Sequence, residues 1–162
     1  MSTLKVDTIE SKTINGNITV SSPLVGDGSQ LSGIIGLTSR TTASATASGL
    51  ADLTAANIDI TAAKTCALLK IETTHAAWIT LYTDGTSRTN DSTRNETTDP
   101  LPGSGVIAEI ITSGAATQII TPGTLAWNND TTPGTTIYAK VYNKSGNTAD
   151  ITVTLHYLQL EA

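Results

Sequence analysis

The residues best suited to chemistry are concentrated between Thr83 and Val106. This stretch reads DGTSRTNDSTRNETTDPLPGSG and has almost no apolar side chains. Its charged residues are Asp84, Asp91, Glu96, Asp99, Arg88 and Arg94. Several carboxylates close together are what a calcium site needs, although the spacing differs from that of a calcium-binding loop. Because arginines alternate with the acids, the acids can instead form ion pairs, in a loop that is solvated or contacts a partner. Whether segment 84–105 binds an ion stays open at this point.

The histidines, the cysteine and the serine of GSG give no pattern typical of an enzyme. His75 starts a predicted strand and His156 lies on the outward face of the last one, so we expect surface or interface residues. Cys66 is the only cysteine, and its setting KTCALLKI predicts a buried thiol without a redox role. Ser104 lacks the residues of a nucleophile elbow. We therefore predict no enzyme, no cofactor and no metal site at these residues. A hydrolase would need a carboxylate pair assembled by segment 84–105.

Aromatic side chains are few, with two Trp, four Tyr and no Phe. Most of them are therefore expected in the core. Trp127 lies in the turn-like stretch AWNNDTTPG and is the best candidate for an exposed ring that contacts a glycan. Packing of Trp127 in the core or at its rim is the preferred expectation.

Charge and hydropathy exclude two classes of partner. Nine basic residues against fourteen acidic ones give a net charge of −5, and Lys and Arg form no cluster that would follow a phosphate backbone. The longest apolar runs, GIIGL and CALL, are far shorter than a bilayer span, and the first residues lack the pattern of a secretion signal. We predict neither nucleic-acid binding nor membrane insertion.

Most of the chain consists of short strand-like segments. These segments must position the candidate residues named above. They are rich in Thr, Val and Ile, alternate between apolar and polar residues, and are separated by turn residues. The segments are 45–49, 57–62, 66–73, 77–83, 106–112, 117–121, 136–143 and 149–160. Eight such strands predict an all-β fold, with an antiparallel β-sandwich or jelly-roll-like domain at 37–162.

Two segments show the alternation most clearly. In 149–160, one face carries Ile151, Val153, Leu155 and Tyr157. In 136–143, the apolar face consists of Ile137, Ala139 and Val141, and the opposite face of Tyr138, Lys140 and Tyr142. Since side chains point alternately to the two faces of a strand, the apolar faces are predicted to line the core.

Residues 1–36 differ from the rest of the chain. Two strand-like phrases, LKVDTIE and NGNITV, precede a glycine-rich connector, SSPLVGDGSQLSGIIG. Each phrase is too short to be stable alone, because a lone strand leaves its backbone N–H and C=O groups unpaired. We therefore expect an extended N-terminal segment that becomes ordered only against other chains.

Two parts of the sequence resemble proteins of tailed phages. The run LKVDTIESKT to NGNITV, followed by GDGSQLSG, resembles the starts of tail-fibre-like proteins, especially those of phages that infect cyanobacteria. The text from SRTTASATASG through WITLYTD, TDPLPGSGVIAEIIT and VTLHYLQLE is similar to a carboxy-terminal domain of phage structural proteins. The resemblance implies a virion component, assembled in the bacterial cytoplasm, without catalytic residues.

The resemblance also implies a homotrimeric fibre attached to the tail or baseplate through its N-terminus. On this interpretation, three copies of residues 1–36 complete one another through the apolar side chains of Leu4, Val6, Ile9, Ile14, Ile18 and Val20. The shaft repeats and large receptor-binding tip of long fibres are missing. The expected partners are other copies of the chain and virion proteins of the tail, baseplate, neck or capsid. A head-surface fibre or decoration protein, and a carbohydrate-binding module that recognises a host surface glycan, are the alternatives.

Overall fold

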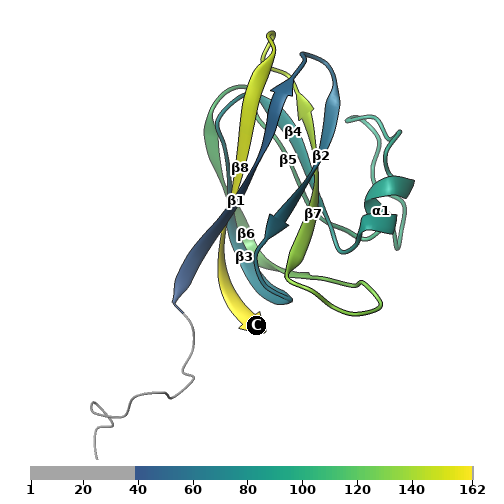
Figure 1. Cartoon of the computed structure of the whole chain (residues 1–162), viewed down its shortest axis with the longest axis vertical. Coiled ribbons are helices and arrows are strands. Elements are labelled where there is room, and N and C mark those ends of the chain that lie inside the picture. The colour runs from purple at the N-terminus through teal and green to yellow at the C-terminus, as the bar shows by residue number, and fades with distance from the viewer. Residues whose placement is uncertain (1–38, 162) are drawn as a thin grey trace, which may run out of the picture. The chain divides into compact units, whose positions relative to one another are not determined.

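Two four-stranded antiparallel sheets make up the part of the protein that the structure describes. The computed structural model describes residues 39–161. The strands are β1 (Arg40–Leu50), β2 (Ala55–Thr61), β3 (Thr65–Thr73), β4 (Ala77–Tyr82), β5 (Val106–Ile111), β6 (Ala116–Trp127), β7 (Thr136–Asn143) and β8 (Ala149–Glu161), and one short helix, α1 (Gly85–Asn90), lies among the described residues (Figure 1). The all-β sandwich predicted from the sequence is confirmed for this part of the chain. The expected N-terminal segment, 1–36, with its apolar residues from Leu4 to Val20, lies outside the described residues.

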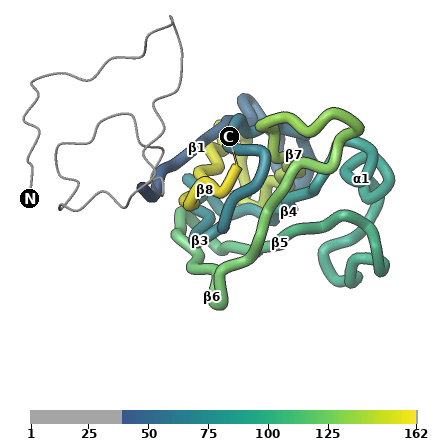
Figure 2. Tube along the Cα trace, turned by 90° about the horizontal axis from the view of Figure 1, so that it is seen from below, coloured from purple at the N-terminus to yellow at the C-terminus, as the bar shows by residue number. Residues whose placement is uncertain are grey.

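The strand orders explain how the chain closes into a sandwich. One sheet has the order β1-β8-β3-β6 and the other β2-β7-β4-β5. All connections between consecutive strands cross from one sheet to the other, except β4 to β5, which are neighbours in one sheet. These are the orders of an eight-stranded jelly roll. Figure 2 shows the two layers from below, with α1 outside the layer that contains β4 and β7.

The core lies between the sheets and is aliphatic. The predicted alternation of 149–160 is confirmed, since Ile151, Val153, Leu155 and Tyr157 are buried. Ile137, Ala139 and Val141 of β7 are buried in the same cluster. Each fully buried Val, Leu or Ile side chain of this core stabilises the fold by about 1.5–3 kcal/mol.

Two strands are longer than the sequence predicts. β1 begins at Arg40 instead of Ala45, and β6 continues past Thr121 to Trp127. The residues added to β1 are small or exposed, and those added to β6 include Pro122 and Gly123. Both extensions therefore lack the apolar alternation that marks a strand. Pairing with a neighbouring strand defines these extensions instead. Arg40 of β1 is opposite Leu158 of β8, and Trp127 of β6 is opposite Thr65 of β3.

No described helix has the length and apolar character needed to span a bilayer. The only helix of residues 39–161, α1, has six residues and buries none of its side chains. Its role is to start the segment 84–105, which leaves β4 and returns to β5.

Candidate functional site

Three rows of side chains cross the outer face of the β2-β7-β4-β5 sheet. Each row runs from β7 through β4 to β5. The first row is Tyr142, Trp78 and Ile111, the second is Lys140, Thr80 and Glu109, and the third is Tyr138, Tyr82 and Val106. All six residues of β4 are buried, although alternate ones point away from the core. Segment 84–105 packs on this face and buries them.

Asp84 fixes the start of this segment. Its carboxylate caps α1, with Oδ1 accepting from Ser87 N at 2.7 Å, while Oδ2 accepts from Ser87 Oγ at 2.8 Å and Thr83 Oγ1 at 3.0 Å. Burial works to raise the pKa of Asp84, but the hydrogen bonds from Ser87 and Thr83 outweigh it and hold the pKa below its usual value. Asp84 therefore acts as a charged N-cap, which stabilises the first helical turn.

Asp91 is the centre of a buried ionic network. Arg94 Nε donates to both of its carboxylate oxygens, at 2.8 and 2.9 Å, and Tyr82 Oη donates to Oδ2 at 2.7 Å. Lys140 Nζ donates to the backbone carbonyl of Asp91 at 2.7 Å and lies 3.7 Å from Oδ2. Arg94 also forms an ion pair with Glu109. The network joins segment 84–105 to β4, β5 and β7.

The pKa shifts in this network follow from burial and pairing. Burial favours the neutral acid at Asp91, yet the hydrogen bonds from Arg94 and Tyr82 and the charges of Arg94 and Lys140 lower its pKa. At Lys140, burial dominates and lowers the pKa despite the attraction of Asp91. Burial, followed by the hydrogen bond to Asp91, raises the pKa of Tyr82. The carboxylate of Asp91 is thus held charged while Tyr82 is held protonated.

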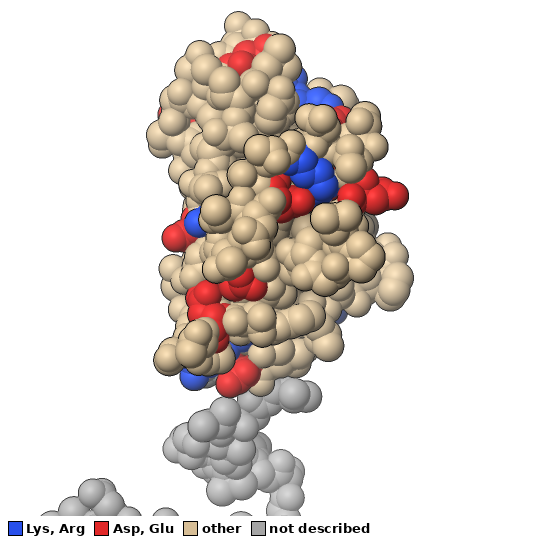
Figure 3. Space-filling model, turned by 90° about the vertical axis from the view of Figure 1, so that its right-hand side faces the viewer, with Lys and Arg blue, Asp and Glu red and all other residues tan. Residues whose placement is uncertain are grey.

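Arg88 and Glu96 of the segment also have charged partners. Arg88 Nη1 lies 2.7 Å from Asp59 Oδ1 and donates to the carbonyl of Ile58, and Lys144 Nζ pairs with both oxygens of Glu96 at 2.6 and 2.7 Å. Figure 3 shows acidic and basic side chains next to each other on the upper half of this face. Within residues 39–161, no three His, Cys, Asp or Glu side chains come together in a way that would hold a metal ion. Asp91 and Glu96 thus form ion pairs of the kind that the sequence offered as an alternative to a calcium site.

A pocket of about 470 Å³ lies between segment 92–97 and the sheet. Trp78 and Tyr142 form its aromatic side, with ring centroids 6.1 Å apart and planes tilted by 54°. Its other lining residues are Ala55, Ser92, Thr93, Arg94, Asn95, Glu96, Thr97 and Lys140. The sequence predicts that Lys140 and Tyr142 lie on the face of 136–143 opposite the apolar one, but it does not by itself indicate a binding site there. Two tyrosines and a lysine alternating on one face were the available signal.

Trp127 lies elsewhere, at the end of β6. Its side chain is 45% exposed, and it lines a second pocket of about 500 Å³ together with Leu101, Ser104 and Asn129. Its row in the other sheet is Trp127, Thr65 and Glu161. The ring of Trp127 is thus exposed, although packing in the core or at its rim was the preferred expectation, whereas Trp78 is buried under segment 84–105.

The histidines and Cys66 are separate from both pockets. His75 lies in the bend before β4, and its Nδ1 is 3.1 Å from Thr74 Oγ1. His156 is on the outward face of β8, with Nε2 3.1 Å from Glu72 Oε2. Cys66 is fully buried, and burial raises the pKa of its thiol to about 11. The structure thus places Cys66 in the core, as expected.

Comparison with known proteins adds no family to this description. No model of a known protein family matches the chain, and no curated protein matches its sequence. What the protein does is therefore inferred from its own residues.

Proposed function

We propose that the protein is a structural component of a phage particle, a short homotrimeric fibre attached to the tail or baseplate through its N-terminus. The observation that carries this proposal is the pairing of Arg40 with Leu158. Because β1 starts where β8 finishes, the first described residues lie at one end of the sandwich. Loops 51–54 and 144–148 form the opposite end (Figure 1).

The fold and the sequence support this proposal in different ways. Jelly rolls occur in viral capsid proteins and in lectins, but a fold alone does not fix a function. The resemblance of LKVDTIE, NGNITV and VTLHYLQLE to phage structural proteins favours the viral role. A sandwich with its own core, preceded in the sequence by two short strand-like phrases, suits a protein that is anchored by one part and projects the other.

The partners in this proposal are two more copies of the chain and a virion protein of the tail, baseplate, neck or capsid. Residues 1–36 would order when these partners pair with their strand-like phrases, which offsets the entropy lost on ordering. A head-surface fibre or decoration protein uses the same anchoring and differs only in its place on the particle.

Particle incorporation tests the proposed anchor. A variant that lacks residues 2–30 is expected to remain folded, with the far-ultraviolet circular dichroism of a β-sandwich, and to be absent from purified particles. The full chain, produced in the same way, is the control and is expected to copurify with them. Equal incorporation of both proteins would contradict the anchoring role.

A second candidate function, recognition of a host glycan, is favoured by one observation. The half-exposed ring of Trp127 adjoins a pocket with hydroxyl and amide groups from Ser104 and Asn129. Aromatic faces and hydrogen-bonding side chains are the groups that hold sugars. A glycan array probed with the full chain and with Trp127→Ala tests this second function. Specific binding by the full chain that is lost on substitution supports glycan recognition, whereas absence of binding by the full chain leaves only the structural role.

A further inference from the structure

A groove of about 630 Å³ lies on the outer face of the β1-β8-β3-β6 sheet, and all four strands contribute residues to its lining. One wall is formed by β6, which bulges away from β3 there. Lys70 of β3 is opposite Ile119 of β6, and Leu68 is opposite Thr124. A single residue of β3 therefore spans the same length as residues 120–123 of β6. Bulges bend a strand, and they are frequent next to functional sites.

The groove contains cations that have no carboxylate partner. Among residues 39–161, the Lys and Arg side chains that pair with a carboxylate are Arg88, Arg94, Lys140 and Lys144. The described residues provide no such partner for Arg40, Lys64 or Lys70. Arg40 and Lys70 both line the groove, and none of its described lining residues is acidic. In a chain with a net charge of −5, this is a local excess of positive charge.

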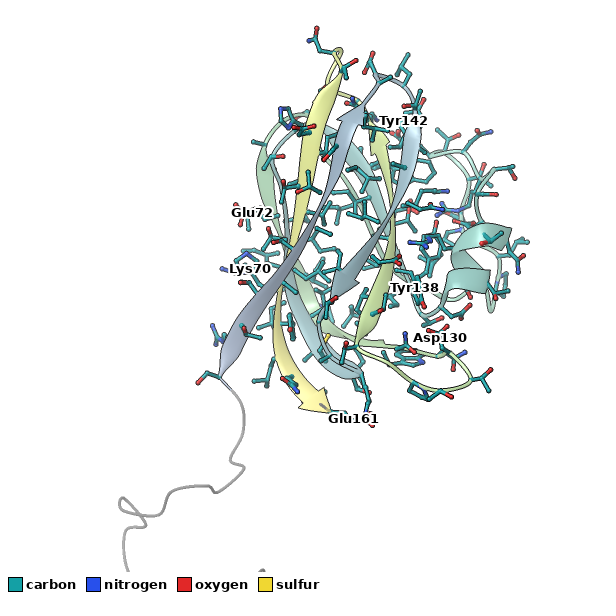
Figure 4. All side chains as sticks on the ribbon, viewed as in Figure 1. Lys70, Glu72, Asp130, Tyr138, Tyr142 and Glu161 are labelled. Carbon is teal, nitrogen blue, oxygen red and sulfur yellow. The ribbon has the colours of Figure 1, made fainter. Side chains whose placement is uncertain are left out.

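His156 is the third basic group of the groove. It is opposite Thr42 on one side and Lys70 on the other, and its Nε2 lies 3.1 Å from Oε2 of Glu72. Glu72 therefore offsets the charge of a protonated His156, while Lys70 keeps no carboxylate partner among the described residues. Figure 4 shows Lys70 and Glu72 at the left of the sandwich, on the side opposite α1.

Arg40 and Lys70 lie on the two sides of β8. Arg40 is opposite Leu158 and Lys70 is opposite His156, and these two residues of β8 are on the same face. Since neighbouring strands are about 4.7–4.9 Å apart, the backbones of β1 and β3 are about 10 Å apart. Both long side chains can therefore contact one anionic group placed over β8. A carboxylate suits such a place, because the guanidinium of arginine binds it through two parallel hydrogen bonds.

The other lining residues indicate what the carboxylate belongs to. Thr41 and Thr42 of β1 and Thr121 of β6 place hydroxyl groups on both walls, and Ile119 offers an aliphatic surface that is 59% exposed. A sugar ring has hydroxyls for the former and C–H groups for the latter. An acidic peptide fits less well. Because the groove lies on the face of the sheet and not along a strand edge, the peptide's backbone N–H and C=O groups would find no strand to pair with.

We propose that this groove binds an acidic saccharide, with a sugar carboxylate between Arg40 and Lys70 and the sugar ring against Ile119 and the threonine hydroxyls. The inference goes beyond the functions proposed above, because Trp127 does not line this groove. Binding of acidic sugars here and glycan recognition at Trp127 are therefore separate, and each can fail while the other stands. Neither depends on the place of the protein in a phage particle.

Imidazole resonances test the proposal in the full chain. The protein has two histidines, of which His156 lines the groove and His75 does not, and His75→Gln assigns their ring signals. The probes are methyl glucuronide, N-acetylneuraminic acid and trigalacturonic acid. At pH 7 and low salt, at least one probe is expected to shift the His156 signals in a saturable way, while those of His75 stay in place. Binding is expected to weaken in about 0.5 M sodium chloride, because salt screens exposed charges.

Two variants and one neutral sugar test the role of charge. Lys70→Met and Arg40→Gln are each expected to weaken binding about two- to fivefold, the range for loss of one exposed ion pair. Lys64→Met is the matched control, because it removes the same charge from a lysine outside the groove, and it is expected to retain wild-type affinity. Methyl glucoside differs from methyl glucuronide in lacking the carboxylate, and it is expected to give no saturable shift.

Three results would overturn the inference. One is the absence of a saturable shift of the His156 signals with any acidic sugar. Another is an equal loss of affinity in Lys70→Met and Lys64→Met, which would mean that net charge and not the groove attracts the probes. The third is binding of sodium sulfate, or of triglutamate with blocked ends, as tight as that of trigalacturonic acid. In that case the groove responds to negative charge alone and does not select a saccharide.

Discussion

Lys140 Nζ on β7 donates a hydrogen bond to the backbone carbonyl of Asp91, 2.7 Å away and 49 residues earlier in the chain. The ammonium group is almost fully buried, so the bond forms away from bulk water. It ties the middle of segment 84–105 to the centre of the sheet.

Replacement of Lys140 is expected to loosen the segment. Lys140→Met keeps much of the apolar stem but leaves the Asp91 carbonyl without its donor, which is expected to lower the free energy of unfolding by about 1–3 kcal/mol. Amide exchange in 84–105 should accelerate more than in β8. Lys70→Met, at an exposed lysine of β3, is the control and should change neither quantity measurably.

Removal of the Asp91 charge is expected to be more severe. Asp91→Asn leaves Arg94 and Lys140 buried with one carboxylate fewer, and breaking a buried pair in this way costs about 3–5 kcal/mol. Urea denaturation at pH 7 measures the loss. Asp99→Asn, at an exposed acid of the same segment, is expected to stay within about 0.5 kcal/mol of wild type. Equal effects of the two substitutions would contradict the buried network.

The Asp91 network also predicts a dependence of stability on pH. The pKa of Asp91 is lower in the folded protein than in the unfolded chain, where it is about 3.9. Its contribution is therefore complete above about pH 5 and is lost as the pH falls through the folded-state value. The difference in Tm between wild type and Asp91→Asn should be constant from pH 7 to about pH 5 and shrink below about pH 4. A difference that does not change down to pH 2 would count against the charged carboxylate.

Gly105 closes the segment and is expected to tolerate no side chain. Its φ is +72°, and an added Cβ would lie 2.7 Å from both Ser87 Cβ and Thr83 Oγ1. Gly105→Ala combines backbone strain with a steric clash and is expected to cost about 2–4 kcal/mol. Gly103→Ala is the matched control, because its φ is +76° and nothing lies within 4 Å of the added Cβ. Thermal unfolding of the two variants separates clash from strain.

Cys66 is expected to report on opening of the core. Burial raises its thiol pKa to about 11, and its side chain is inaccessible, so alkylation by iodoacetamide at pH 8 should be slow in the folded protein. Labelling should become rapid in denaturant and faster in Gly105→Ala than in wild type. Rapid labelling of the native protein would mean that the core is open around β3.

The sequence was most informative where a strand alternates strongly. The faces of β7 and β8 could be predicted because their large apolar residues occur at every second position, as in Ile151 to Tyr157. The first residues of β1 could not, because Thr and Ala do not distinguish a strand from a loop. The helix α1 has six polar residues or glycines, and only its N-cap, Asp84, signals its start.

The candidate site was less predictable because its partners are distant in sequence. The charges of segment 84–105 are visible in the sequence, but nothing local shows that Asp91 meets Lys140 or that Glu96 meets Lys144. The alternation of arginines and acids within the segment predicted ion pairs, and this prediction is correct for Asp91 and Arg94. Burial of Trp78 depends on the segment folding back over β4, and that is a tertiary contact without a local pattern.

The molar mass of the full chain in solution tests the proposed function most directly. If residues 1–36 join three copies, light scattering should give three times the 16.7 kDa of one chain, while a variant that lacks residues 2–36 should be a folded monomer. A full chain that stays monomeric at micromolar concentration would contradict the trimeric fibre. So would a shortened variant that still forms trimers, because the contacts would then lie within the sandwich.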